Sequence, residues 1–451
     1  MWQRIKLSTG ANSGDEEEER NLRLKSLIVL VIAWDLFIVV FGMLFAPPFK
    51  GADSIIGLPD STMRLFYLGE SMFFHALSIP FVAMLSYIAL AIFDTRGRTS
   101  TLVRISATGS FSLASSSAMY TVLSGSNPVS IAVFWSGLML SVVSGVGLAI
   151  VLWPKKDDRA HMKLKGRSLV ALTVWMSLIC VLAAVLVGVY VSTGSAQWGA
   201  MSAFKGFRLA RALHVHVVIT SIDVALVALI ARYFGADGYL GTPGLFVKIG
   251  LCGLLFGIPT TTVATFVTVP LGVAAHDAIT AFAAILLQAS LFIMYAIMAV
   301  EGRNLGIGNA KGVLKNIMTF GLLFIIFWVN VVVTLPGIYV AVNLKSFRGQ
   351  PNELAFITGH EHILITLTAV AALMLVAHMY RVKGILGIIG GSGLTAGYVL
   401  SSAATVPYMF LDWNTVGSAY MPYIRAGIAL MVVGTLTVLV SLAKQWELAA
   451  D

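Results

Sequence analysis

The sequence predicts an all-α integral membrane protein, and three observations lead to this fold class. Of its 451 residues, 58% are hydrophobic and 11% are charged, which leaves too few polar groups to cover a soluble globule of this size. The mean hydropathy is +0.89. Apolar runs of about 20 residues, the length with which an α-helix crosses a bilayer, recur along the whole chain. The runs are continuous rather than alternating, which excludes a β-barrel.

Twelve of these runs are predicted to span the membrane as helices. They lie near residues 25–46, 68–93, 101–123, 130–153, 168–192, 206–233, 245–269, 275–300, 317–341, 357–380, 384–408 and 422–446. No low-complexity linker divides the chain, so we expect one membrane domain. It covers residues 25–446, between an N-terminal tail (1–24) and a C-terminal tail (447–451). We therefore expect this domain to lie in a lipid bilayer.

The net charge of +9 is carried by short loops, which favours a topological role over nucleic-acid binding. Basic residues gather after the second, fourth and eighth predicted helices, at Arg96, Lys155 and Arg303 for example. By the positive-inside rule, these loops and both termini face the cytoplasm. We expect no nucleic-acid partner.

Six of the eight histidines are predicted to share one depth near the outer face of the bilayer: His75, His214, His216, His276, His360 and His362. Ionisable groups inside a bilayer are costly and are rarely left unpaired. Imidazole is also a common ligand of heme iron, copper and non-heme iron. Nearly equal intervals separate His75, His216 and His362 along the chain. This spacing predicts three groups of four helices, each presenting histidine from its second helix.

Two His-x-His segments carry most of this layer, at 214–216 and 360–362. Residues two apart on a helix point about 200° away from each other, so that one helix can ligate two different metals. We therefore expect a bis-histidine heme between His75 and one member of the second segment, whose other member faces a second cofactor. The alternative for each histidine alone is a hydrogen bond to a neighbouring helix. A transporter without a cofactor would leave the layer unexplained.

The segment from Thr358 to His362, followed by Ile-Leu-Ile-Thr, and the tripeptide Phe74-His75-Ala76 carry a family resemblance. They resemble the catalytic subunit (subunit I) of the heme-copper oxidase superfamily, and its nitric oxide reductase branch in particular. The resemblance implies twelve helices in three pseudo-symmetric groups. It also implies that His75 and His362 bind a low-spin heme, that His360 is the proximal ligand of a high-spin heme, and that the chain lies in a prokaryotic cytoplasmic membrane. The implied function is a respiratory-chain oxidoreductase that passes electrons to the high-spin heme, which reduces a small molecule such as nitric oxide or oxygen.

The sequence departs from this family at the seventh predicted helix. Family members hold copper or non-heme iron with one histidine on helix 6 and two on helix 7, whereas residues 257–262 read Gly-Ile-Pro-Thr-Thr-Thr. Hydroxyls are poor substitutes for imidazole on a transition metal. Either His214 or His216, together with His276, forms a site completed by a carboxylate or water, or the second metal is lost. The alternative function is a non-catalytic electron-transfer subunit that links a partner enzyme or quinone pool to another carrier.

Four arginines are expected to bind heme propionates, because a guanidinium fork suits a carboxylate. They are Arg208, Arg211, Arg348 and Arg425. Interfacial anchoring is the alternative for each. The chain contains no CxxCH heme-attachment motif. We therefore expect a separate electron-donor subunit, cytochrome c-like or cupredoxin-like, with a quinone as a further partner.

Overall fold

A computed structural model defines the fold. It describes residues 13–45, 60–125, 127–154, 162–194, 201–271, 276–302, 304–330, 332, 336, 338, 339, 343, 353–410 and 418–450.

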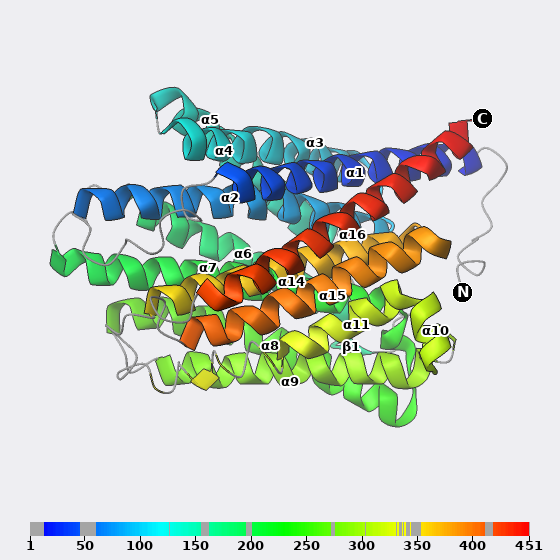
Figure 1. The fold of residues 1–451 in the computed structure, drawn as a ribbon. Coiled ribbons are helices and arrows are strands. Elements are labelled where there is room, and N and C mark those ends of the chain that lie inside the picture. The colour runs from blue at the N-terminus through cyan, green and yellow to red at the C-terminus, as the bar shows by residue number, and fades with distance from the viewer. Residues whose placement is uncertain are drawn as a thin grey trace.

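The described chain is a bundle of long helices that lie roughly side by side (Figure 1). A two-residue hairpin in one loop is formed by the antiparallel strands β1 (Lys163–Leu164) and β2 (Arg167–Ser168). The helices are α1 (Ser13–Phe45), α2 (Asp60–Ile92), α3 (Arg98–Ser110), η4 (Phe111–Ser115), α4 (Ser116–Ser124), α5 (Pro128–Val151), α6 (Leu169–Gly194), α7 (Met201–Tyr233), η6 (Ala236–Gly238), α8 (Gly241–Leu271), α9 (His276–Glu301), α10 (Ala310–Lys315), α11 (Ile317–Val329), α14 (Glu353–Met379), α15 (Gly384–Phe410) and α16 (Ser418–Ala450).

Eight of the predicted spans are confirmed as helices long and apolar enough to cross a membrane. They are Met72–Ile92, Pro128–Val151, Leu169–Leu186, His214–Tyr233, Gly241–Ala264, His362–Met379, Gly384–Pro407 and Ala419–Lys444. Helices also occupy the described parts of the other four, around 25–46, 101–123, 275–300 and 317–341. The all-α membrane class is thus established, whereas the number of twelve spans stays a prediction.

Three of the helices that bear histidine, α2, α7 and α14, form the inside of the bundle. In the span windows, 72% of α2, 61% of α7 and 67% of α14 is buried, against 28–44% for the other five spans. These three helices contact one another, and α14 also contacts α11, α15 and α16. Ionisable groups on membrane helices face the bundle interior for energetic reasons. Their burial places the predicted histidines where such groups are tolerated.

Helices α15 and α16 approach each other through glycines. A Cβ built on Gly397 would lie 2.6 Å from the carbonyl oxygen of Gly427, and one built on Gly427 would lie 2.7 Å from the carbonyl oxygen of Gly397. Gly393 and Gly434 make equally close approaches further along the same pair. Small residues let two backbones touch, which is the main route to helix association in lipid. This interface therefore depends on the absence of side chains.

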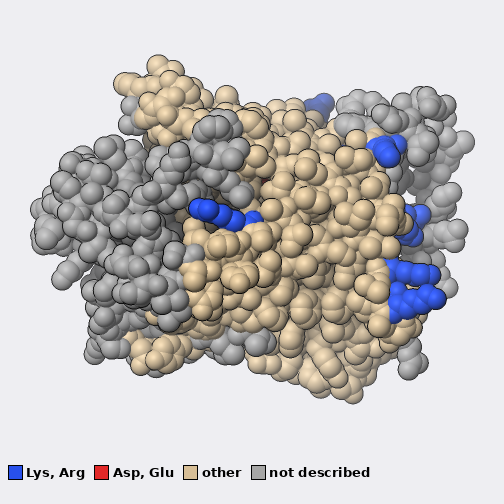
Figure 2. Space-filling model, viewed as in Figure 1, with Lys and Arg blue, Asp and Glu red and all other residues tan. Residues whose placement is uncertain are grey.

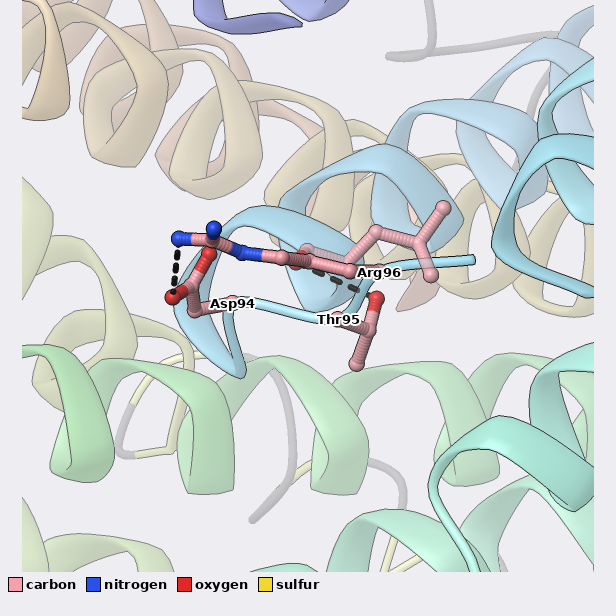
Figure 3. A network of polar contacts seen from close by, with 4 residues as sticks. Asp94, Thr95 and Arg96 are labelled. Atoms are coloured by element: carbon pink, nitrogen blue, oxygen red, sulfur yellow. Dashed lines mark hydrogen bonds and ion pairs between the residues drawn. The ribbon is translucent and has the colours of Figure 1, made fainter. Parts of the chain in front are cut away.

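The three inner helices end in a similar way. Asp94 after α2, Gly235 after α7 and Arg381 after α14 all have positive φ, of 45°, 67° and 56°. After α2, Thr95 N–H donates to Leu90 O and Asp94 N–H to Ala91 O, a common helix-ending motif. Figure 3 shows this turn, where the Arg96 guanidinium also bonds the Asp94 carboxylate at 3.2 Å. Both side chains are more than half exposed, so that the ion pair stabilises little.

These ends also share a register with the histidines. The intervals from 75 to 94, from 216 to 235 and from 362 to 381 are each 19 residues. The turn that stops each inner helix thus lies at the same distance from a histidine. This agreement supports three repeated groups of helices, which remain a prediction.

Candidate functional site

The site is built from histidines of α2, α7 and α14. His75, His214 and His360 lie within these helices, as do His216 and His362. The side chains of all five are half-buried. The predicted gathering of these histidines on neighbouring inner helices is therefore present.

The first ring pair joins α2 to α7. The imidazoles of His75 and His214 have centroids 6.5 Å apart and planes inclined by 20°. Phe134 of α5 meets the His75 ring edge-on, with centroids 5.4 Å apart. The pair therefore lies against an aromatic wall that limits the access of water.

A proline and a serine fix the backbone at His75. Pro80 lies inside α2 and lacks the N–H that would bond the carbonyl of Ala76 four residues earlier. Ser115 supplies the missing donor, since its hydroxyl bonds Ala76 O at 2.6 Å. Trp34 Nε1 in turn donates to Ser115 Oγ at 2.9 Å. Ser115 is the last residue of η4, a π-helical turn of the kind that often marks functional sites.

The orientation of His214 is set by α6. Its Nδ1 lies 2.8 Å from the carbonyl oxygen of Ala184. Because a carbonyl only accepts, Nδ1 carries the proton and Nε2 has the free lone pair. A Cβ built on Gly188 would lie 2.7 Å from Cε1 of this ring, so that glycine leaves the space that the ring occupies. A backbone carbonyl that fixes the tautomer is the usual support of a metal-binding histidine.

The second ring pair joins α7 to α14. His216 and His360 have ring centroids 6.0 Å apart and planes inclined by 25°. His214 and His216 thus reach different neighbours, as the spacing of two residues on one helix predicts.

His362 lies against an aromatic side chain of α2. Its ring centroid is 4.8 Å from that of Phe74, at an angle of 57°. The predicted sharing of one heme by His75 and His362 stays a prediction, since the ring contact described for His75 on a histidine is the one with His214.

Two of the three contacts share a register when His75, His216 and His362 are taken as equivalent. His75 meets His214 and His216 meets His360, in each case the residue two before the equivalent position on the other helix. His362 meets Phe74, which lies one residue before His75, so the third contact departs from this register.

The threonines of α8 are engaged with their own helix. The hydroxyls of Thr260, Thr261 and Thr262 donate to the carbonyls four residues before them, at 2.6–2.9 Å. Within the part of the chain that the structure describes, no group of three or more His, Cys, Asp or Glu side chains could hold a metal ion. Copper or non-heme iron as a second metal stays untested.

Several predicted residues lie wholly or partly outside the described structure. The side chains of His276, Arg208 and Arg211 belong to helices but are not described, and Arg348 lies outside the described residues. Arg425 is exposed on α16. Propionate binding by the four arginines stays a prediction.

Two polar contacts between α7 and α14 were not predicted. Thr368 donates to Asp223 at 2.6 Å, and the Tyr233 hydroxyl lies 2.9 Å from His378 Nδ1. Both pairs are 145 residues apart in the chain. A constant offset between polar residues of two helices was the signal in the sequence that could have revealed them.

Comparisons with protein-family models, with curated proteins and with solved structures found no match for this chain.

Proposed function

We propose that this chain binds two hemes inside the membrane and relays electrons between partner proteins. One heme would be held by His75 and His214, and the other by His216 and His360. The single observation that carries the proposal is the geometry of the two pairs, with ring centroids 6.5 and 6.0 Å apart and nearly parallel planes.

This spacing suits one metal ion between each pair of rings. Two imidazoles on opposite sides of one ion have centroids about 6 Å apart, given metal–nitrogen bonds of about 2 Å. A heme iron facing a second metal ion would need roughly 4 Å more. The ring separations of 6.5 and 6.0 Å both match a single ion between two imidazoles.

The number of ligands favours heme over a bare ion. A transition metal held by protein alone generally takes three or four side chains, and no such group exists among the described residues. Heme, when bound, supplies four porphyrin nitrogens and an iron that gains and loses one electron. The protein would then need to supply only two histidines for each heme.

The chain's own residues would orient the ligands and keep water away. Ala184 holds the tautomer in which His214 Nε2 is available, and Gly188 leaves room for that ring. Ser115 keeps the backbone next to His75 in place. Phe134 covers one side of the His75 ring.

A relay is favoured over reduction of nitric oxide or oxygen by the position of His216. The reductase predicted from the family resemblance needs an open iron position opposite His360, and the His216 ring stands 6.0 Å from that of His360. The hydroxyls of Thr261 and Thr262 bond within α8, and this also favours a relay over a second metal site. An electron donor of cytochrome c or cupredoxin type, and a quinone, remain part of this proposal.

The test is heme stoichiometry in purified variants. The wild-type chain should bind two low-spin hemes, and His75→Ala and His216→Ala should each lose about one, with partial recovery in added imidazole. The matched control is His378→Ala, a histidine of α14 bonded to Tyr233, which should keep both. A wild-type chain without heme, or a His75→Ala spectrum identical to the wild type, would refute the proposal.

Carbon monoxide distinguishes the two functions. If both irons carry two histidines, the reduced protein should not bind the gas, and whatever heme His216→Ala retains at the His360 site should begin to bind it. Binding by the wild type at the His360 site would instead support the reductase.

A further inference from the structure

A cavity of about 250 Å³ lies at the ends of α7 and α14, away from the ring pairs formed by His214 and His216. Its walls come from the ends of α7 and α14, from the loop around Asn304 and from the starts of α11 and α15. Tyr233 and His378 lie in it, and both are far along their helices from His216 and His360. The cavity is therefore separate from the proposed heme sites.

Three cations line this cavity: Lys315, Arg381 and Lys383. All three are exposed, and its lining contains no Asp or Glu. Among the described residues, ion pairs are formed by Arg96 and by Arg232, and by none of these three. Figure 2 shows Lys and Arg side chains gathered at this end of the molecule, near the end of α16. The lining itself thus carries three positive charges and no negative one, and the Glu301 carboxylate lies just outside it, 3.2 Å from Asn304 Nδ2.

Uncharged donors complete the lining. Asn304, Asn316 and Thr319 contribute amide and hydroxyl groups beside the cations. Asn316 also holds the loop, through bonds from its Nδ2 to Gly312 O at 3.2 Å and Gly306 O at 3.4 Å. The Asn304 amide donates to the Glu301 carboxylate at 3.2 Å, so the three cations and the Thr319 hydroxyl are the groups that would bind phosphate oxygens.

Arg381 occupies a backbone conformation that favours glycine. Its φ is 56°, and α7 has Gly235 in the corresponding turn. Residues with a Cβ are strained there, and strain of this kind gathers at binding sites. Asp94 after α2 adopts a similar conformation, so Arg381 lines the cavity from a helix-ending turn.

We propose that this cavity binds a phosphate group, carried either by an acidic phospholipid or by a free phosphate compound. Basic pockets between membrane helices bind such headgroups. The volume of about 250 Å³ is smaller than pockets for drug-sized ligands, which begin near about 300 Å³. It fits a headgroup better than a whole heme or quinone.

The test measures binding to purified, delipidated protein in neutral detergent by native mass spectrometry and by titration. The probes are phosphatidylglycerol, phosphatidylcholine and inorganic phosphate. The cavity variant combines Lys315→Gln, Arg381→Gln and Lys383→Gln. The control combines Arg98→Gln, Lys165→Gln and Lys311→Gln, which removes three exposed cations outside the cavity lining. Helicity and monodispersity confirm that both variants fold.

We expect phosphatidylglycerol to bind the wild type and control alike, and the cavity variant at least about ten-fold more weakly. Phosphatidylcholine should bind weakly to all three. Inorganic phosphate that binds as tightly as the lipid would support the site and assign it to a free phosphate compound. Equal losses in both variants, or no binding of either anionic probe to the wild type, would overturn the proposal. If the cavity variant does not fold, Lys383→Gln alone replaces it, with Lys311→Gln as its control, and the same outcomes decide.

Discussion

Two helix pairs of this protein are held together in different ways. Between α15 and α16, glycines bring backbone onto backbone, as at Gly397 and Gly427. Between α7 and α14, polar side chains meet at three levels: His216 with His360, Asp223 with Thr368, and Tyr233 with His378.

This difference distinguishes a helix contact that only holds the fold together, α15–α16, from one that also carries chemically active groups, α7–α14. Close backbone approach gains dispersion contacts that need no titratable group, and a single added side chain destroys it. Polar pairs between membrane helices contribute modestly to association, on average about 0.6 kcal/mol. The α7–α14 pair therefore carries groups that packing alone does not require. Substitutions at Gly427 and Asp223 test this comparison directly, and substitutions at Ser115 and Tyr239 test contacts outside the two helix pairs.

The largest effect is expected at Gly427. Leucine there would clash with the Gly397 carbonyl oxygen, 2.7 Å from the position of the new Cβ, and should destabilise the fold by about 3 kcal/mol. Thermal unfolding followed by circular dichroism measures the loss. The control, Ala429→Leu, places the same side chain at an exposed position of α16 and should unfold like the wild type. Equal unfolding of both variants would show that the glycines do not hold this interface.

Ser115→Ala should have the next largest effect. It removes the donor to Ala76 O, which Pro80 leaves without a helical partner. A buried carbonyl without a hydrogen bond costs about 2 kcal/mol. Loss of heme from the His75 site should accompany the lower melting temperature. Ser136→Ala, at an exposed serine of α5, is the control. A variant with wild-type stability and spectrum would remove Ser115 from the site.

Asp223→Asn should change stability by no more than about 1 kcal/mol. The amide oxygen still accepts from Thr368, whose hydroxyl also lies 3.1 Å from Leu364 O. Chemical unfolding gives the difference in free energy. A loss as large as that of Gly427→Leu would break the distinction between the two helix pairs.

The smallest effect is expected at Tyr239, in the loop after α7. Burial, and then the negative charge of Glu301, raise the pKa of this phenol above its ordinary value. A group with a raised folded-state pKa stabilises the fold below its unfolded pKa and loses this contribution at higher pH. Between about pH 9.5 and 11, the melting temperature of the wild type should fall more than that of Tyr239→Phe. Parallel curves would contradict the raised pKa.

Helix positions, and the gathering of histidines on neighbouring helices, could be predicted from the sequence. Apolar length alone located eight spans, and the same reasoning placed His75, His214 and His360 on inner helices. Both properties are local, because hydropathy and helical periodicity are encoded in consecutive residues.

The pairing of the rings could not be predicted in the same way. Which helix faces which depends on packing between distant segments, so His75 was assigned to His362 by resemblance, whereas its described histidine contact is His214. The supporting role of Ser115 depends on a π-helical turn that no pattern indicated. The shared interval of 19 residues became visible only once the positive φ angles were known.

His214 and His216 stand on one rigid helix and reach neighbours on different sides of it. A displacement of α7 would therefore change both ring separations at once. With the proposed hemes in place, it would alter both of their redox potentials without any change in their ligands.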